Sequence, residues 1–166
     1  MIDKGRIEIN LDREFPNEKT ILDFLQNGQL YEPDVFHAFV RVLEKGDRVF
    51  DVGANIGFFT LLSAALVGPE GAVVSFEPDA ENIKRLSANI DLNGLNNVTT
   101  IERPASDKVE QVGFYINSDN SGGNALWDPA LFPGNDESKA NPKRLDMQTT
   151  TLAERKPGRS AAAISN

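Results

Sequence analysis

The sequence predicts an α/β protein with a doubly wound, mostly parallel β-sheet. Short apolar runs with the character of strands alternate with longer segments of helical periodicity between residues 31 and 116. Glycine-containing turns separate these segments, as at residues 68–71 and 93–94. A strand–helix–strand–helix–strand order at this spacing is typical of right-handed βαβ units, in which the strands are parallel.

The length and composition of the chain limit the classes of protein it can belong to. The 166 residues suffice for one domain with a hydrophobic core. The formal net charge of −8 argues against nucleic acid as a partner, because phosphate backbones repel an acidic chain. No cysteine is present, which excludes disulfides, thiolate metal sites and cysteine nucleophiles and suits a cytoplasmic location. We expect no membrane partner, since no apolar run approaches the ~20 residues that span a bilayer. We also expect no signal segment, because residues 1–10 contain no apolar run, and no metal site.

The first part of the chain is the least determined. Residues 1–30 are mixed and polar, and we interpret them as an N-terminal extension. Alternation over residues 7–9 predicts a short edge strand, and residues 20–25 predict a short helix. A stronger helix signal follows Glu32, where Pro33 would occupy the first turn.

The central part alternates strands and helices. Strands are predicted at residues 48–52, 72–77, 98–102 and 112–116, and helices at residues 55–67 and after the capping residue Asp79. Residues 117–144 are rich in Asn, Ser, Gly, Pro and Asp and predict a long, mobile substrate loop or lid. Residues 154–166 predict a flexible tail.

The segment after the first strand is the first candidate for chemistry. Asp51 ends this strand, and Gly53 and Gly57 bracket three residues before the next helix. Gly53 permits a sharp turn, and Gly57 permits a close approach of the backbone to a ligand at the helix N-terminus. Ligands of open α/β sheets bind at the carboxyl ends of the strands. Taken alone, however, the loop also fits a turn that merely packs.

A second acid strengthens the case for a ligand. Glu77 ends the second strand, where a carboxylate can accept hydrogen bonds from both hydroxyls of a ribose, although it could also cap the helix after Pro78. Loop and acid together predict a nucleoside-type ligand. Asn55 occupies the middle glycine position of the dinucleotide pattern, so the phosphate-cradling motif is broken. An acid at Asp51 also suits a cationic cofactor better than a pyrophosphate.

These segments resemble the FkbM family of S-adenosylmethionine-dependent methyltransferases over roughly residues 30–153. The resemblance rests on Asp-Val-Gly-Ala-Asn-Ile-Gly-Phe-Phe-Thr at 51–60, Gly-Pro-Glu-Gly-Ala-Val-Val-Ser-Phe-Glu-Pro at 68–78, Tyr31-Glu32-Pro33, Asn89, Asn93, Ala105-Ser106-Asp107 and Thr150-Thr151-Leu152. It implies a Rossmann-like fold of the class I methyltransferase type, with residues 31–153 as a partial cofactor-binding domain. It also implies methyl transfer from S-adenosyl-L-methionine, usually to a hydroxyl of a small molecule or sugar.

The same resemblance implies a set of cofactor-binding residues. The methionine part would lie beside Asp51, Gly53, Ala54, Asn55 and Gly57, the ribose beside Glu77, and the adenine beside Pro78, Pro104, Ala105 and Ser106. Glu32 would reach the amino group of the cofactor, or would only begin its helix.

Catalytic residues cannot be assigned from the sequence. A hydroxyl acceptor needs a general base, and none is evident. His37, the single histidine, is expected on the solvent side of its helix. Asp119 and Asp128 lie in the long loop and are weak candidates for the base, while Trp127 could stack on a substrate or anchor the loop.

The chain departs from the family pattern after Leu152. The family continues into a strand and a Lys-x-Asp-x-Glu-Gly type motif, whereas residues 155–166 have a different character. We therefore expect a truncated chain with an incomplete C-terminal half and little or no activity. Its strand at residues 49–52 would lie at an open sheet edge and promote self-association. The alternatives left open are a non-catalytic S-adenosylmethionine-binding module and a dinucleotide-binding oxidoreductase half.

Overall fold

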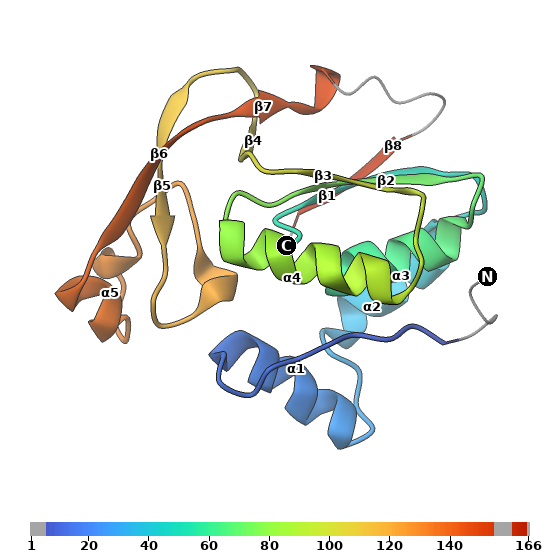
Figure 1. The fold of residues 1–166 in the computed structure, drawn as a ribbon, viewed down its shortest axis with the longest axis horizontal. Helices are drawn as coiled ribbons and strands as arrows, with labels where there is room; N and C mark the ends of the chain where they lie inside the picture. The colour runs from blue at the N-terminus through green and yellow to red at the C-terminus, as the bar shows by residue number, and fades with distance from the viewer. Residues whose placement is uncertain (1–5, 155–160, 166) are drawn as a thin grey trace.

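The centre of the molecule is a parallel four-stranded sheet (Figure 1). The structure, a computed structural model, describes residues 6–154 and 161–165. The strand order is β3-β2-β1-β8, with every neighbouring pair parallel. These strands are β1 (Arg48–Val52), β2 (Ala72–Phe76), β3 (Val98–Ile101) and β8 (Ala161–Ser165). The predicted α/β class and three of its predicted strands are confirmed.

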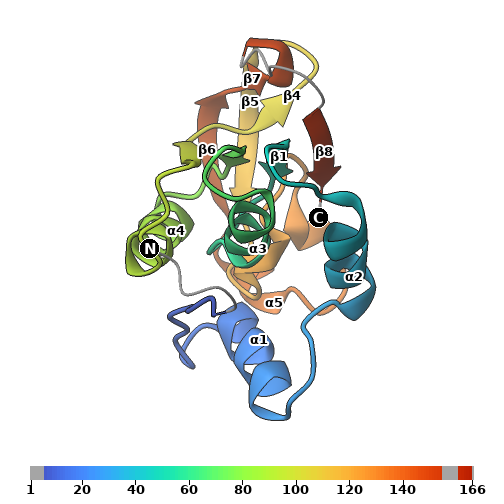
Figure 2. The same cartoon turned by 90° about the vertical axis from the view of Figure 1, so that its right-hand side faces the viewer.

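Three helices cover one face of this sheet. They are α2 (Pro33–Val42), α3 (Phe58–Val67) and α4 (Ala80–Leu92), and α3 lies between the other two (Figure 2). The main hydrophobic core fills the space between them and the sheet, with Phe39, Val49, Phe59, Val73 and Leu86 among its buried members. This arrangement places the loops after β1 and β2 at one end of the sheet.

Local backbone chemistry determines where two of these helices begin. The α3 helix begins at Phe58 rather than at the predicted residue 55, because Asn55 and Gly57 have positive φ angles of 49° and 98° that no α-helix accommodates. The predicted cap of α4 is confirmed, since the carboxylate of Asp79 accepts a hydrogen bond from the backbone N–H of Glu81 at 2.9 Å.

The other face of the sheet carries a smaller apolar cluster. Its buried residues are Phe50, Phe76 and Ile101. Ala105 and Leu152 pack against them from a two-stranded parallel ribbon, β4 (Ala105–Ser106) with β7 (Thr150–Thr151), and from the short helix η3 (Leu152–Glu154). A short β-ribbon and one turn of 3-10 helix therefore cover this cluster, in place of an α-helix.

The predicted loop at residues 117–144 contains ordered elements. It lies between β5 (Gln111–Ile116) and β6 (Lys143–Gln148), which pair antiparallel in a hairpin beside the main sheet (Figure 1), and it holds η1 (Ser121–Gly123), η2 (Pro129–Leu131) and α5 (Asp136–Ala140). Hydrogen bonds of polar side chains hold this segment in its conformation. Asn117 accepts hydrogen bonds from the backbone N–H groups of Asp119 and Asn120, both at 3.0 Å, and Asp119 accepts from that of Ser138 at 2.9 Å.

The prediction of a flexible tail at residues 154–166 is wrong in part. Residues 161–165 form β8, which pairs with β1 in the register Asp51↔Ile164, while residues 155–160 and 166 lie outside the described residues. The predicted open edge at residues 49–52 is wrong for the same reason. The backbone of β1 has a parallel partner on each side, β2 and β8.

The N-terminal segment runs along α4 instead of forming the predicted edge strand. Its backbone pairs with side chains: the N–H groups of Glu8 and Asn10 donate to the amide oxygens of Asn93 and Asn89, both at 2.8 Å. The predicted short helix is longer than expected, because α1 extends over Pro16–Gln26. Within residues 6–154 and 161–165, no helix combines the length and apolar character needed to cross a membrane.

Candidate functional site

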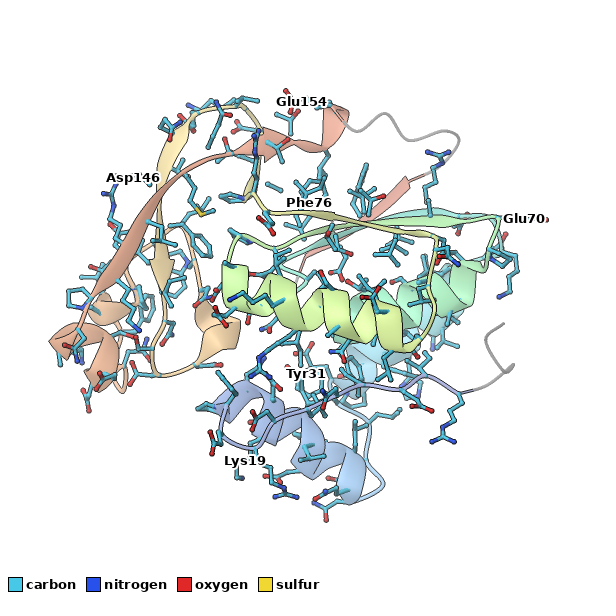
Figure 3. The ribbon with its side chains drawn as sticks, viewed as in Figure 1. Lys19, Tyr31, Glu70, Phe76, Asp146 and Glu154 are labelled. Carbon is cyan, nitrogen blue, oxygen red and sulfur yellow. The ribbon has the colours of Figure 1, made fainter. Side chains whose placement is uncertain are left out.

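A pocket of about 270 Å³ opens where β1 and β2 end. Figure 3 labels Phe76 at this end of β2 and Glu70 at the opposite end of the sheet. The walls come from the loops after three strands and from the segment after β5: Val52, Gly53, Asn55, Phe76, Glu77, Pro78, Pro104, Ala105, Phe114, Gly122, Asn124, Ala125 and Leu126. The pocket thus lies at the carboxyl ends of parallel strands, where α/β proteins bind ligands.

Glu77 supplies the buried charge of the pocket. Its side chain is only 4% exposed. One carboxylate oxygen, Oε2, accepts from the backbone N–H of Asn55 at 2.8 Å, while Oε1 accepts from the N–H of Asp79 at 2.9 Å and from the side-chain amide of Asn82 at 3.3 Å. A carboxylate can accept about four hydrogen bonds, so Oε2 keeps capacity for another donor. Burial raises the pKa of Glu77 to about 7, against the lowering effect of these three donors.

The glycine loop satisfies its own backbone donors. Gly53 and Ala54 both donate from their N–H groups to the carbonyl of Phe76, at 2.9 and 3.0 Å, and Gly57 donates to the carbonyl of Ala54 at 2.8 Å. The two remaining N–H groups are also occupied, since that of Asn55 bonds Glu77 and that of Ile56 donates to the side-chain oxygen of Asn55 at 2.8 Å. A loop with every N–H directed to a protein acceptor lacks the cradle of free donors that a pyrophosphate requires.

Asp51 lies beneath this loop instead of bordering the pocket. It is 2% exposed, and its carboxylate accepts a hydrogen bond from the hydroxyl of Thr60 on α3 at 2.5 Å. The same hydroxyl lies 2.9 Å from that of Ser75, which is the register partner of Asp51 on β2. Burial raises the pKa of Asp51 to about 6, and the Thr60 hydrogen bond opposes this shift. These contacts fasten α3 to the ends of β1 and β2.

The two glycines of the loop differ in their surroundings. Both have positive φ angles, 82° at Gly53 and 98° at Gly57. No atom lies within 4 Å of the position of a Cβ on Gly53, which borders the pocket. A Cβ on Gly57 would lie 2.5 Å from the Cδ1 of Leu86 on α4. Close approach to a ligand is therefore open at Gly53, whereas Gly57 allows α3 and α4 to pack closely.

Some of the other predicted site residues border the pocket and some do not. Asn55, Pro78, Pro104 and Ala105 border the pocket, whereas Ala54 and Ser106 do not. Glu32 does not border it either. It follows Tyr31, whose ring packs edge-on against Phe58 at the start of α3 with centroids 5.3 Å apart. Burial and a hydrogen bond with Glu32 raise the pKa of the Tyr31 hydroxyl to about 12.

Part of the pocket wall was not predicted from the sequence. Phe114 and the segment 122–126 form its outer side. Asn124 fixes this segment, because its side-chain oxygen accepts from the N–H of Asn117 at 2.8 Å and its amide donates to the carboxylate of Asp79 at 2.8 Å. The length of the polar stretch at residues 117–144 indicates a functional loop. Its sequence has no regular pattern, however, that would predict which residues lie at the pocket.

His37, the two loop acids and Trp127 show no catalytic arrangement in the structure. His37 is exposed on α2. The carboxylate of Asp119 accepts from Ser138 and Glu137 at the start of α5, and the Ser138 hydroxyl lowers its pKa. Asp128 caps η2 by accepting from the N–H of Ala130 at 2.9 Å. Trp127 is exposed and stacks on Phe132, with ring centroids 4.6 Å apart.

The fold and the pocket define an α/β protein with a buried carboxylate at the end of β2 and a glycine loop that has no phosphate cradle. Residues 51–157 match the model of the methyltransferase FkbM domain. Because this match covers more than half of the chain, the chain belongs to that family of S-adenosylmethionine-dependent methyltransferases.

Three proteins similar to this chain carry the names of methyltransferases. A protein-L-isoaspartate O-methyltransferase of Ignicoccus hospitalis is 39% identical over 36% of this chain and 28% of its own length. A probable cobalt-precorrin-6B C(15)-methyltransferase of Sulfurisphaera tokodaii is 26% identical over 64% of this chain and 55% of its own length. The solved S-adenosylmethionine-dependent O-methyltransferase of Thermotoga maritima is 27% identical over 53% of this chain and 37% of its own, with a TM-score of 0.43. The chain thus spans less than two thirds of each of these relatives.

Proposed function

We propose that this chain binds S-adenosyl-L-methionine in the pocket at the ends of β1 and β2 and takes part in methyl transfer to a hydroxyl of a small molecule or sugar. The observation that carries the proposal is the buried carboxylate of Glu77 beside the open approach at Gly53. When bound, the cofactor supplies an electrophilic methyl group on a sulfonium.

The residues of the pocket fit this cofactor. The free acceptor capacity on Oε2 of Glu77 suits a ribose hydroxyl, which donates a hydrogen bond. Phe76, Pro78, Pro104, Phe114 and Leu126 give the pocket apolar walls that suit a flat base. The negative charge of Glu77 favours a cation and disfavours a diphosphate.

A dinucleotide is the ligand that the geometry disfavours most. The N–H groups of residues 53–57 all donate to protein acceptors, so a pyrophosphate would have to displace existing hydrogen bonds. This argument weighs against the alternative of an oxidoreductase half.

The acceptor proposal rests on the family resemblance and on charge. A formal net charge of −8 repels a polyanion such as RNA, whereas a small hydroxyl compound or a sugar carries no such penalty. The relatives named above act, by their names, on isoaspartyl protein and on a cobalt precorrin. Their overlap with this chain is too short to transfer either substrate.

Calorimetry with the whole chain tests the cofactor proposal. S-adenosylhomocysteine should bind, and NAD should bind more weakly or not at all. Glu77→Ala should weaken binding by about 1–3 kcal/mol, since a ribose hydroxyl loses its acceptor. Glu102→Ala is the matched control, because this glutamate follows the end of β3 and is exposed. Tighter binding of NAD than of S-adenosylhomocysteine would overturn the proposal.

Binding without turnover is the second candidate function, because Glu77, the one titratable side chain among the described pocket residues, is assigned to the ribose and leaves no other residue there to act as a base. A methyl-transfer assay with radiolabelled S-adenosylmethionine and a panel of hydroxyl compounds separates the two. Label transfer above the rate without protein supports an enzyme, and binding without transfer supports the module.

A further inference from the structure

Asn89 connects the glycine loop to the N-terminal segment, residues 6–12. It lies on α4 and is 1% exposed. Its side-chain amide donates to the carbonyl of Ile56 at 2.9 Å, and its side-chain oxygen accepts from the N–H of Asn10 at 2.8 Å. One side chain therefore bridges two backbone segments that are far apart in the sequence.

The carbonyl of Ile56 is a sensitive point of the loop. Ile56 lies between Asn55 and Gly57, the two residues with positive φ. The N–H groups of Asn55 and Ile56 are fixed by the side chains of Glu77 and of Asn55 itself. Asn89 supplies the partner on the opposite side, and a buried carbonyl without a partner would destabilise this backbone conformation.

The N-terminal segment has its own attachments to α4. Asn93 bonds both the N–H and the carbonyl of Glu8, at 2.8 and 2.6 Å. Glu18, 1% exposed, pairs with Arg85 at 2.7 Å and also accepts from the N–H of Asp12 at 2.7 Å. These contacts hold Asn10 in place on both sides, so its N–H can orient the amide of Asn89.

We propose that Asn89 is a positioning residue for the cofactor pocket, and that the N-terminal segment acts through it on the glycine loop. The inference rests on the function proposed above. Asn89 acts through the carbonyl of Ile56 on Asn55, whose N–H meets Glu77. Residues 6–12 lie outside the 51–157 family match, yet they take part in shaping the loop.

Paired variants of the full chain isolate this role. Asn89→Ala removes both hydrogen bonds, whereas Asn89→Asp keeps the acceptor for Asn10 but cannot donate to Ile56 when ionised. Asp91→Ala is the matched control on the same helix, because this exposed side chain makes no hydrogen bond or ion pair with the described residues. Asn10→Pro removes the backbone donor and leaves Asn89 intact, and Asn10→Ala keeps that donor.

Two readouts are needed, one of which requires no ligand. The first is amide hydrogen exchange at residues 55–57 in the free protein, with the amides of Val49 and Phe50 as a global reference. The second is the Kd for S-adenosylhomocysteine under conditions where each variant is fully folded. Asn89→Ala and Asn89→Asp should raise both exchange at the loop and the Kd by about tenfold, as loss of one buried hydrogen bond predicts. Asn10→Pro should act in the same direction, and Asp91→Ala and Asn10→Ala should have less than a twofold effect.

The outcomes separate the two proposals. If the Asn89 variants accelerate exchange at Val49 and Phe50 as much as at the loop, or leave the loop unchanged, the positioning role is overturned. If the parent protein does not bind S-adenosylhomocysteine while the loop still responds to Asn89, the cofactor proposal fails and the positioning role stands. If Asn89→Ala does not fold, Asn10→Pro decides through the same exchange measurement.

Discussion

Burial disfavours the ionised form of Glu77. Its carboxylate is buried, and desolvation raises its pKa more than its three hydrogen-bond donors lower it. A ribose hydroxyl would add a further donor and favour the ionised form. Ligand binding and proton release at Glu77 should therefore be coupled.

The raised pKa of Glu77 also predicts that the stability of the folded protein depends on pH. A carboxyl whose pKa rises from 4.5 to about 7 on folding binds its proton more tightly in the folded state, so the free energy of unfolding should fall as pH rises from about 4.5 to about 7. The full effect is about 3 kcal/mol, and it should level off above pH 7. Asp51 contributes in the same direction, but its pKa of about 6 confines its effect to lower pH.

Urea unfolding between pH 6 and pH 8 measures the Glu77 contribution. The parent protein should lose stability between pH 6 and pH 7, and Glu77→Gln should show a much smaller loss there, which is due to Asp51. An equal slope in the two proteins would assign the titration to another group.

At the scale of elements, the segment between β5 and β6 depends on a few polar side chains. Asn124 connects the pocket wall at residues 122–126 with Asn117 at the end of β5 and with Asp79 at the start of α4. Leu126, Trp127, Leu131 and Phe132 remain exposed, so apolar burial gives this segment little support.

Asn124→Ala should therefore loosen the outer wall of the pocket. We expect amide exchange at residues 122–126 to rise up to about tenfold, because two part-buried hydrogen bonds are lost, while exchange in β1 and β2 stays unchanged. Asn141→Ala is the control, since Asn141 is an exposed amide on the same polar stretch that bonds only Glu137 through its side chain. Equal exchange in both variants would mean that other contacts hold the wall.

How far the sequence predicts the fold depends on the range of the contacts involved. Strands β1, β2 and β3 and the cap at Asp79 follow from local periodicity and local hydrogen bonding, and they were predicted. The burial of Gly57 against Leu86 and the pairing of residues 161–165 with β1 depend on contacts between distant segments, which periodicity does not encode. The same limit applies to the pocket. Glu77 was found by its position after a strand, whereas Asn124 lies in a stretch without any period.

At the scale of the whole molecule, β8 changes the status of β1. With β2 on one side and β8 on the other, β1 is an interior strand, so the reason for predicting self-association through its edge no longer holds. The sheet instead depends on a pairing formed by residues 161–165.

Proline substitutions test this pairing. In a parallel ladder the N–H groups of successive residues point to opposite sides of the strand. Only one of the two variants Ala162→Pro and Ala163→Pro therefore removes a hydrogen-bond donor to β1. One variant should lower the free energy of unfolding by about 1–3 kcal/mol, with much less effect from its neighbour. Urea unfolding supplies the stability, and sedimentation velocity shows whether the damaged variant associates. Two neutral variants would mean that β8 contributes little to the sheet.

The attachment of the N-terminal segment to α4 also has a kinetic consequence. Glu8 and Asn93 are 85 residues apart, and Asn10 and Asn89 are 79 apart, so each pair closes a long loop of chain. During synthesis, residues 6–12 emerge before α4 and cannot dock until α4 has left the ribosome. The glycine loop would therefore reach its final geometry late in folding, after the strands that flank it have begun to pair.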